Sequence, residues 1–218
     1  METDATADAV KRKERSDLRL ASEAVPVNRA LPAIEGADEV NSRSREEVAW
    51  RAMALLVVAA KGEGLEQADI DEIVENYGLK GHFSPEEAAF IRQSSPSEHD
   101  RIQFTWRYEA AWTLLWALGY VEGLEKPTKI CDVPRAVAFL QERSPEQFLA
   151  DAKLRSTEHI LDEADLIYRY HWAVVDARIN GRPTPAGLDS GVVMERHYAL
   201  NWLIGYMDQE WDDISTDT

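Results

Sequence analysis

Five charged residues lie on helical faces that are otherwise apolar, and they are the positions best placed to do chemistry: Arg51, Arg107, Glu109, Glu195 and Arg196. An ideal helix turns about 100° per residue, which puts Arg196 in the middle of an apolar stripe and Arg107 and Glu109 about 160° apart. Because unpaired charge is costly to bury, each residue needs a partner or a wet cavity. We expect a network that joins all five across three helices.

This network has two functional interpretations and a plainer one. Arginines anchor anionic or polar ligands, so the cluster is a candidate ligand site. An enzyme would use a carboxylate or histidine of the same set as acid or base, with Arg107 or Arg196 as anion anchor. The plainer interpretation is a satisfied ion network that only specifies helix packing. With the polar strip of the last helix included, the ligand-binding candidates are Arg51, Arg107, Glu109, Glu195, Arg196, His197 and Asn201.

The usual catalytic and metal-binding motifs give no assignment. No H-E-x-x-H motif, phosphate-binding glycine loop or G-x-S-x-G elbow is present in the 218 residues. The cluster Glu158, His159, Asp162 and Glu163 is typical of a solvated acidic face rather than a metal site. Cys131 has no histidine near it in sequence, which favours a structural thiol. We therefore expect no metal and no cofactor, and we assign no catalytic residue.

The elements that must position these side chains are all helices. Capping residues, prolines and glycines predict helices over 44–61, 66–77, 97–118, 157–179 and 190–207, with shorter ones after Ser84, Asp132 and Ser144. No alternating pattern predicts a strand. We expect an all-α, compact multi-helix single domain over residues 14–218, preceded by a disordered tail over 1–13. Residues 15–23 could form a short helix, and about 24–43 should be an extended arm on the domain.

Charge and composition limit which partners and which cellular location the protein can have. The net charge of −16 argues against binding nucleic acid or anionic membranes, and the basic run at 11–15 is typical of a solvated helix start. With one cysteine, no signal sequence and no long apolar stretch, a cytoplasmic location is expected. Most of the seven tryptophans should be core. Trp211, beside Asp212 and Asp213, either anchors the tail or belongs to a partner surface.

Several separated motifs carry a resemblance to a known family. They are residues 25–28 (VPVN), 31–35 (LPAIE), 43–52 (RSREEVAWRA), 106–110 (WRYEA), 115–119 (LWALG), 195–203 (ERHYALNWL) and 211–213 (WDD). In this order they resemble DUF4272, a family of uncharacterised bacterial proteins. The resemblance implies a bacterial, cytosolic origin and one structural unit from about Arg15 to the C-terminus. It implies no activity, cofactor or catalytic residue.

These observations favour a non-catalytic module that binds a protein or a small polar ligand. Two alternatives stay open. One is an enzyme that uses the Arg/Glu cluster on a polar or anionic substrate. The other is an immunity-type inhibitor of a toxin, which the acidic charge and small size suggest.

Overall fold

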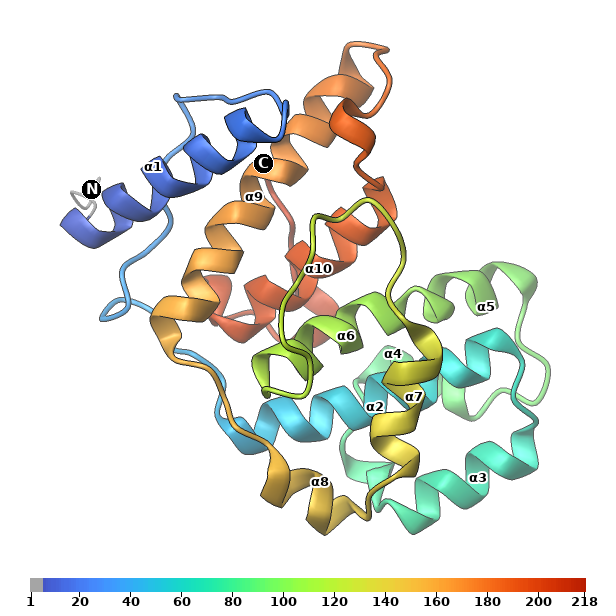
Figure 1. The fold of residues 1–218 in the computed structure, drawn as a ribbon. Helices are drawn as coiled ribbons and strands as arrows, with labels where there is room; N and C mark the ends of the chain where they lie inside the picture. Colours follow the sequence, from blue (N-terminus) through green and yellow to red (C-terminus); the bar gives the residue numbers. More distant parts are fainter. Residues whose placement is uncertain (1–5) are drawn as a thin grey trace.

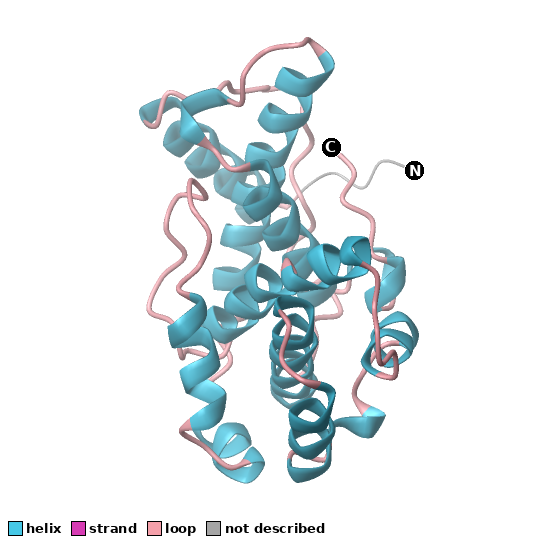
Figure 2. Cartoon of the chain, turned by 90° about the vertical axis from the view of Figure 1, so that its right-hand side faces the viewer, coloured by secondary structure: helices cyan, strands magenta, loops and turns pink. Residues whose placement is uncertain are grey.

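The computed structural model describes residues 6–218, and within this range every regular element is helical (Figure 2). The α-helices are α1 (Ala7–Ser22), α2 (Arg45–Glu63), α3 (Gln67–Asn76), α4 (Pro85–Ile91), α5 (Glu98–Thr105), α6 (Arg107–Ala117), α7 (Val133–Gln141), α8 (Pro145–Asp151), α9 (Thr157–Ile179) and α10 (Ser190–Leu203). Short 3-10 turns lie at Leu79–Gly81, Pro185–Gly187, Tyr206–Asp208 and Trp211–Asp213. The all-α prediction is therefore confirmed.

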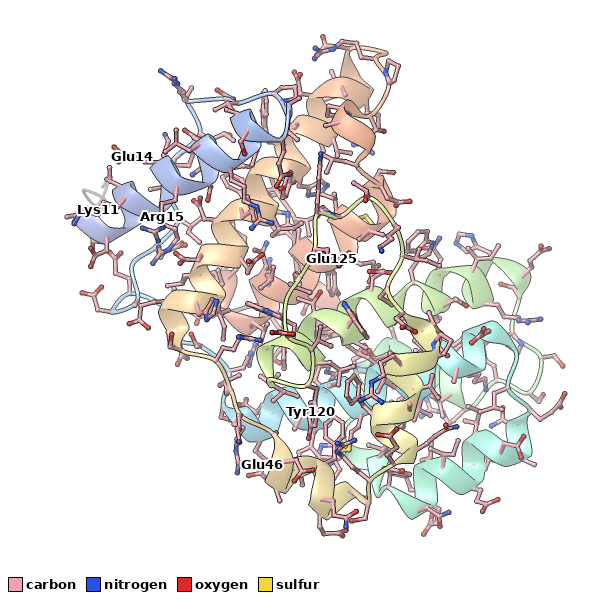
Figure 3. The ribbon with its side chains drawn as sticks, in the orientation of Figure 1. Lys11, Glu14, Arg15, Glu46, Tyr120 and Glu125 are labelled. Atoms are coloured by element: carbon pink, nitrogen blue, oxygen red, sulfur yellow. The ribbon has the colours of Figure 1, made fainter. Side chains whose placement is uncertain are left out.

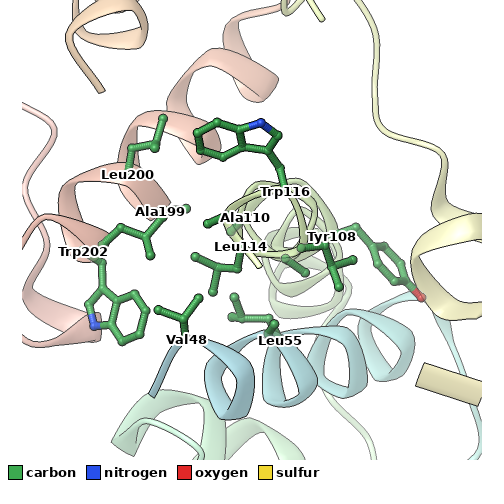
Figure 4. Packing of buried hydrophobic residues seen from close by; sticks show 14 of the residues in the cluster. Val48, Leu55, Tyr108, Ala110, Leu114, Trp116, Ala199, Leu200 and Trp202 are labelled. Atoms are coloured by element: carbon green, nitrogen blue, oxygen red, sulfur yellow. The ribbon is translucent and has the colours of Figure 1, made fainter. Parts of the chain in front are cut away.

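Two packed layers meet at α6. Helix α2 lies along α5 and α6 on one side, and α10 lies between α6 and α9 on the other (Figure 1). The outer helix α1 packs on α9, while α3, α4, α7 and α8 surround α2. Leu114 of α6 points into the space between Val48 of α2 and Ala199 of α10, so one apolar core joins the layers (Figure 4).

The central position of α2 follows from its sequence. Ser44 and Glu47 form a capping box that starts the helix, and Gly64 ends it with a φ of 117°. The stretch between Ala52 and Ala59 is apolar all round and fully buried. Gly62 permits close packing, because a Cβ there would lie 2.7 Å from the Thr105 backbone nitrogen. Helices α2 and α5 therefore approach closely at this end.

Three boundaries differ from the sequence prediction. The helix predicted over 97–118 is broken at Trp106, where the Glu109 amide donates to the Trp106 carbonyl and tightens the turn. The last helix ends at Leu203 instead of 207, because Gly205 has a φ of 68°. The tail predicted to be disordered over 1–13 is helical from Ala7 onward, and residues 1–5 lie outside the described residues.

The basic run at 11–15 helps to attach α1 to the rest of the domain. Arg12 is 3% exposed and donates to the Asp162 side chain and the Glu35 carbonyl. Arg15 also pairs with Asp162, at 2.6 Å. Lys11 and Glu14 lie on the outward side of α1 (Figure 3). These contacts tie α1 to α9, so this basic run is largely engaged within the protein.

The sequence predicts an extended arm over about 24–43. Residues 24–43 contain no regular element, yet Val25 and Leu31 are buried against the domain. The arm ends where the Arg43 amide donates to the Leu203 carbonyl. Within the residues described, no helix is both long and apolar enough to cross a membrane.

Candidate functional site

Two of the predicted charged residues form a direct pair across the central layers. Nη1 of Arg107, at the start of α6, lies 3.0 Å from Oε2 and 3.2 Å from Oε1 of Glu195 on α10. Burial raises the pKa of the Glu195 carboxyl, while the Arg107 charge opposes the rise. The pair therefore links α6 to α10. Burying the two charges costs desolvation free energy, and the attraction between them offsets part of that cost.

A second pair lies beside the first. Arg51 of α2 donates from Nη1 to Oε2 of Glu87 at 2.5 Å. Glu87 is 1% exposed and also accepts from the Ser84 amide, as the capping box of α4 predicts. The spacing of Ser84 and Glu87 fits a capping box, but no local pattern marks the contact of Glu87 with α2.

Trp211 covers both pairs. The guanidinium carbon of Arg51 lies 5.1 Å from the Trp211 ring centroid, and that of Arg107 lies 5.8 Å from it. Arg107 also lies over the Tyr198 ring, at 4.8 Å. We call this set the Trp211 cluster: Arg51, Glu87, Arg107, Glu195, Tyr198 and Trp211.

The Trp211 cluster is mostly buried, although the side chains of Arg51 and Arg107 stay 12% and 19% exposed. Trp211 is 2% exposed, so its ring is buried against the domain in this structure. Asp212 accepts from the Glu86 amide at 3.0 Å, which fastens the tail to α4, whereas Asp213 is exposed. Four buried polar atoms here lack a hydrogen-bond partner: Arg51 Nε, Glu87 Oε1, Arg107 Nε and Trp211 Nε1.

Glu109 and Arg196 lie in a different environment from the Trp211 cluster. Oε1 of Glu109 accepts from the Cys131 amide, and Nη1 of Arg196 donates to the Glu125 carbonyl at 2.6 Å. Glu109 Oε2 and Arg196 Nε are both buried without a partner. Burial raises the pKa of Glu109, and the Cys131 amide and the Arg196 charge oppose that rise. The structure therefore divides the five charged residues into two groups, where the sequence predicted one network.

A groove opens beside Glu109, with a volume of about 690 Å³. It lies where the segment leading into α7 crosses the junction of α5 and α6 (Figure 1). We call it the α5–α6 groove. Its lining residues are Gly62, Glu63, Pro96, Glu98, Arg101, Ile102, Thr105, Trp106, Tyr108, Glu109, Ile130 and Val133.

The walls of the α5–α6 groove are mainly apolar. Ile102 is 52% exposed and Ile130 is 60% exposed, and both border the groove. The Trp106 ring packs on Gly191 of α10, where a Cβ would lie 2.5 Å from it. No local sequence pattern marks these wall residues, since they come from segments far apart in the chain.

The remaining predicted residues lie on the far side of α10. Nδ1 of His197 lies 2.8 Å from Nδ1 of His171 on α9. Burial lowers the pKa of His197 to about 3 and that of His171 to about 4, so both rings are neutral near pH 7. Asn201 donates to the Ser215 carbonyl at 2.9 Å. Both His197 and Asn201 also line a separate cavity of about 420 Å³.

Five of the seven motifs that resemble a known family fall on α2, α6, α10 and the tail, and the other two, 25–28 and 31–35, fall on the arm. The family model described as "Domain of unknown function (DUF4272)" matches residues 12–214. The chain belongs to the DUF4272 family. The match spans α2 through α10 and the Trp211 turn, so the family domain includes both the Trp211 cluster and the α5–α6 groove.

No curated protein and no solved structure matches this DUF4272 chain.

Proposed function

We propose that this DUF4272 protein is a non-catalytic binding module, and that its α5–α6 groove takes a small, mostly apolar ligand. The single observation that carries the proposal is the groove itself. Its volume of about 690 Å³ lies within the range of roughly 300–1,000 Å³ that small-molecule pockets occupy. Such pockets combine apolar walls with a few polar groups, and here Ile102, Trp106 and Ile130 line the groove together with the buried Glu109.

The chemistry near the groove favours binding over catalysis. Cys131 donates from Sγ to the Tyr108 carbonyl at 3.6 Å, and burial raises the pKa of its thiol. A protonated thiol is a poor nucleophile. Of the acid/base candidates Glu109, Glu195 and His197, the last two are engaged with Arg107 and His171 away from the groove lining. Glu109 lines the groove and accepts from the Cys131 amide.

The contacts within the Trp211 cluster are consistent with a packing role. Its arginines are paired with carboxylates and lie against the Trp211 ring, so their charges are already compensated within the protein. The groove needs no rearrangement, because its walls are already exposed. We therefore assign ligand binding to the groove rather than to the Arg/Glu cluster.

Binding of the neutral apolar dye Nile red tests this function. We expect a fluorescence increase with the unmodified protein, and a loss of affinity of about tenfold in the double variant Ile102→Ser, Ile130→Ser. Both side chains are more than half exposed, so the fold should tolerate the changes. Ile179→Ser is the matched control, because Ile179 is 75% exposed and lies outside the groove. Equal dye binding by all three proteins, or none by any, would contradict the proposal.

A further inference from the structure

The charges around the α5–α6 groove are mostly negative. Three carboxylates line it, from Glu63, Glu98 and Glu109, against the single guanidinium of Arg101. Arg101 donates to the carbonyls of Gly62 and Glu63, at 3.2 and 3.3 Å, so its charge is directed at the negative C-terminal end of α2. The groove thus shares the negative sign of the whole protein, which carries a net charge of −16.

Glu109, one of the lining residues, has a carboxylate oxygen without a hydrogen-bond partner. The residue is 2% exposed, its Oε1 accepts from the Cys131 amide, and its Oε2 is buried with no partner. A buried carboxylate oxygen left without a donor costs free energy. Arg196 acts on Glu109 electrostatically, but it donates to the Glu125 carbonyl. A donor brought by a ligand would therefore satisfy Oε2.

A second carboxylate is held in place at the rim. The Tyr108 hydroxyl donates to Oε2 of Glu63 at 3.0 Å. Burial and the neighbouring Glu63 charge both raise the pKa of Tyr108, so the phenol keeps its proton and remains a donor. Glu63 places a second acidic side chain beside an exposed apolar wall, which adds to the attraction for a cation.

Together these observations define the ligand by its chemistry. We propose that the groove binds a cationic amphiphile, namely a primary alkylamine whose ammonium donates to Glu109 Oε2 while its alkyl chain packs on Ile102 and Ile130. This inference rests on the function proposed above and specifies its ligand class. An ammonium is a compact donor, which suits an acceptor as buried as Glu109. A carboxylate head would instead meet three like charges.

Displacement of Nile red by three ligands of one chain length tests the inference at pH 7. The probes are dodecylamine, dodecanol and dodecanoate, each below the concentration at which it aggregates. We expect the amine to bind at least tenfold more tightly than the alcohol, and the carboxylate most weakly. A hydrogen bond to a charged group accounts for a difference of about 10- to 100-fold. In Glu109→Gln, amine affinity should fall about tenfold or more, while alcohol affinity should change less than threefold.

Control variants separate the charge at Glu109 from overall charge. Glu46→Gln makes the same change at an exposed position at the start of α2, away from the groove, and should leave all affinities unchanged (Figure 3). Glu63→Gln alters an exposed carboxylate, and amine affinity should fall about threefold. This second variant keeps the test decisive if Glu109→Gln does not fold.

The outcomes distinguish the two proposals. Equal displacement by all three ligands, with loss in the Ile102→Ser, Ile130→Ser variant, overturns the amine inference and leaves the binding function standing. An amine preference that survives both Glu109→Gln and Glu63→Gln overturns the assignment of the carboxylates. Failure of the protein to bind the dye or any of the three ligands overturns the binding function itself.

Discussion

The Nδ1 atoms of His171 and His197 lie 2.8 Å apart between α9 and α10, which requires one ring to donate and the other to accept. The two rings must therefore adopt different neutral tautomers. His197 is 2% exposed and His171 is 8% exposed, so neither ring has much water to stabilise a positive charge. A proton that binds to this pair must enter a buried interface between two helices.

We expect the histidine pair to make the protein less stable in acid. Burial lowers both pKa values from 6.5, to about 4 for His171 and about 3 for His197, with Arg178 adding to the effect on His171. Between pH 6.5 and 4 the unfolded chain binds protons that the folded protein does not. The free energy of unfolding should therefore fall by up to about 1.4 kcal/mol per histidine for each pH unit. Urea unfolding at pH 7, 6 and 5 measures this.

Variants isolate the histidine contribution from that of the carboxylates. His197→Gln removes one of the titrating groups, so its free energy of unfolding should depend less steeply on pH than that of the unmodified protein. His99→Gln, which changes an exposed histidine, should keep the original pH dependence. Identical slopes for all three proteins would contradict the prediction.

The division of the charged residues into two groups predicts which pairs are energetically coupled. Removing Arg107 or Glu195 leaves its buried partner unpaired, so either substitution to alanine should lower the free energy of unfolding by about 3–5 kcal/mol. The double variant should cost less than the sum, by about 1–3 kcal/mol. Glu109→Ala combined with Glu195→Ala should instead be additive within about 0.5 kcal/mol, since the two carboxylates have different partners.

Chemical denaturation of these single and double variants measures the coupling. Strong coupling between Glu109 and Glu195 would contradict the division into two groups and support the single network predicted from the sequence. Unchanged melting temperatures of Glu109→Ala and Arg196→Ala would show that these buried charges contribute little to stability.

Local signals in the sequence predicted the helices well. The capping boxes of α2 and α4, at Ser44 and Ser84, mark their starts because each satisfies backbone amides within one turn. Helix α9 has the predicted bounds, Thr157–Ile179. The helical wheel also placed Arg107 and Glu109 on different faces, and the structure gives them different partners.

Tertiary contacts were not predictable in the same way. Glu87 has a clear local role as a capping residue, but its contact with Arg51 joins positions 36 residues apart in the chain. A helical projection of residues 97–118 assumes one continuous helix, and the break at Trp106 makes that assumption wrong. The α5–α6 groove combines residues near positions 62, 102 and 130, and only the packing of α2, α5 and the segment before α7 brings these together.

Trp211 should contribute to stability through its ring. Trp211→Ala removes the cover from Arg51 and Arg107, and we expect the free energy of unfolding to fall by about 3–5 kcal/mol. Trp211→Phe should cost less, because it keeps an aromatic face and because Nε1 has no hydrogen-bond partner to lose. Met207→Ala, at a 68% exposed position in the same tail, should have little effect. Urea unfolding measures all three variants. An unchanged free energy of unfolding in Trp211→Ala would contradict the anchoring role.

Gly191→Ala tests the link between α10 and the α5–α6 groove. A Cβ at this position would lie 2.5 Å from the Trp106 ring, so the ring must move or α10 must shift. We expect a loss of about 1–3 kcal/mol in the free energy of unfolding, as for other overpacked sites, together with weaker Nile red binding because Trp106 lines the groove. Gly123→Ala is the matched control, since a Cβ there meets nothing within 4 Å. Unchanged dye affinity in Gly191→Ala would show that the position of Trp106 does not shape the binding surface.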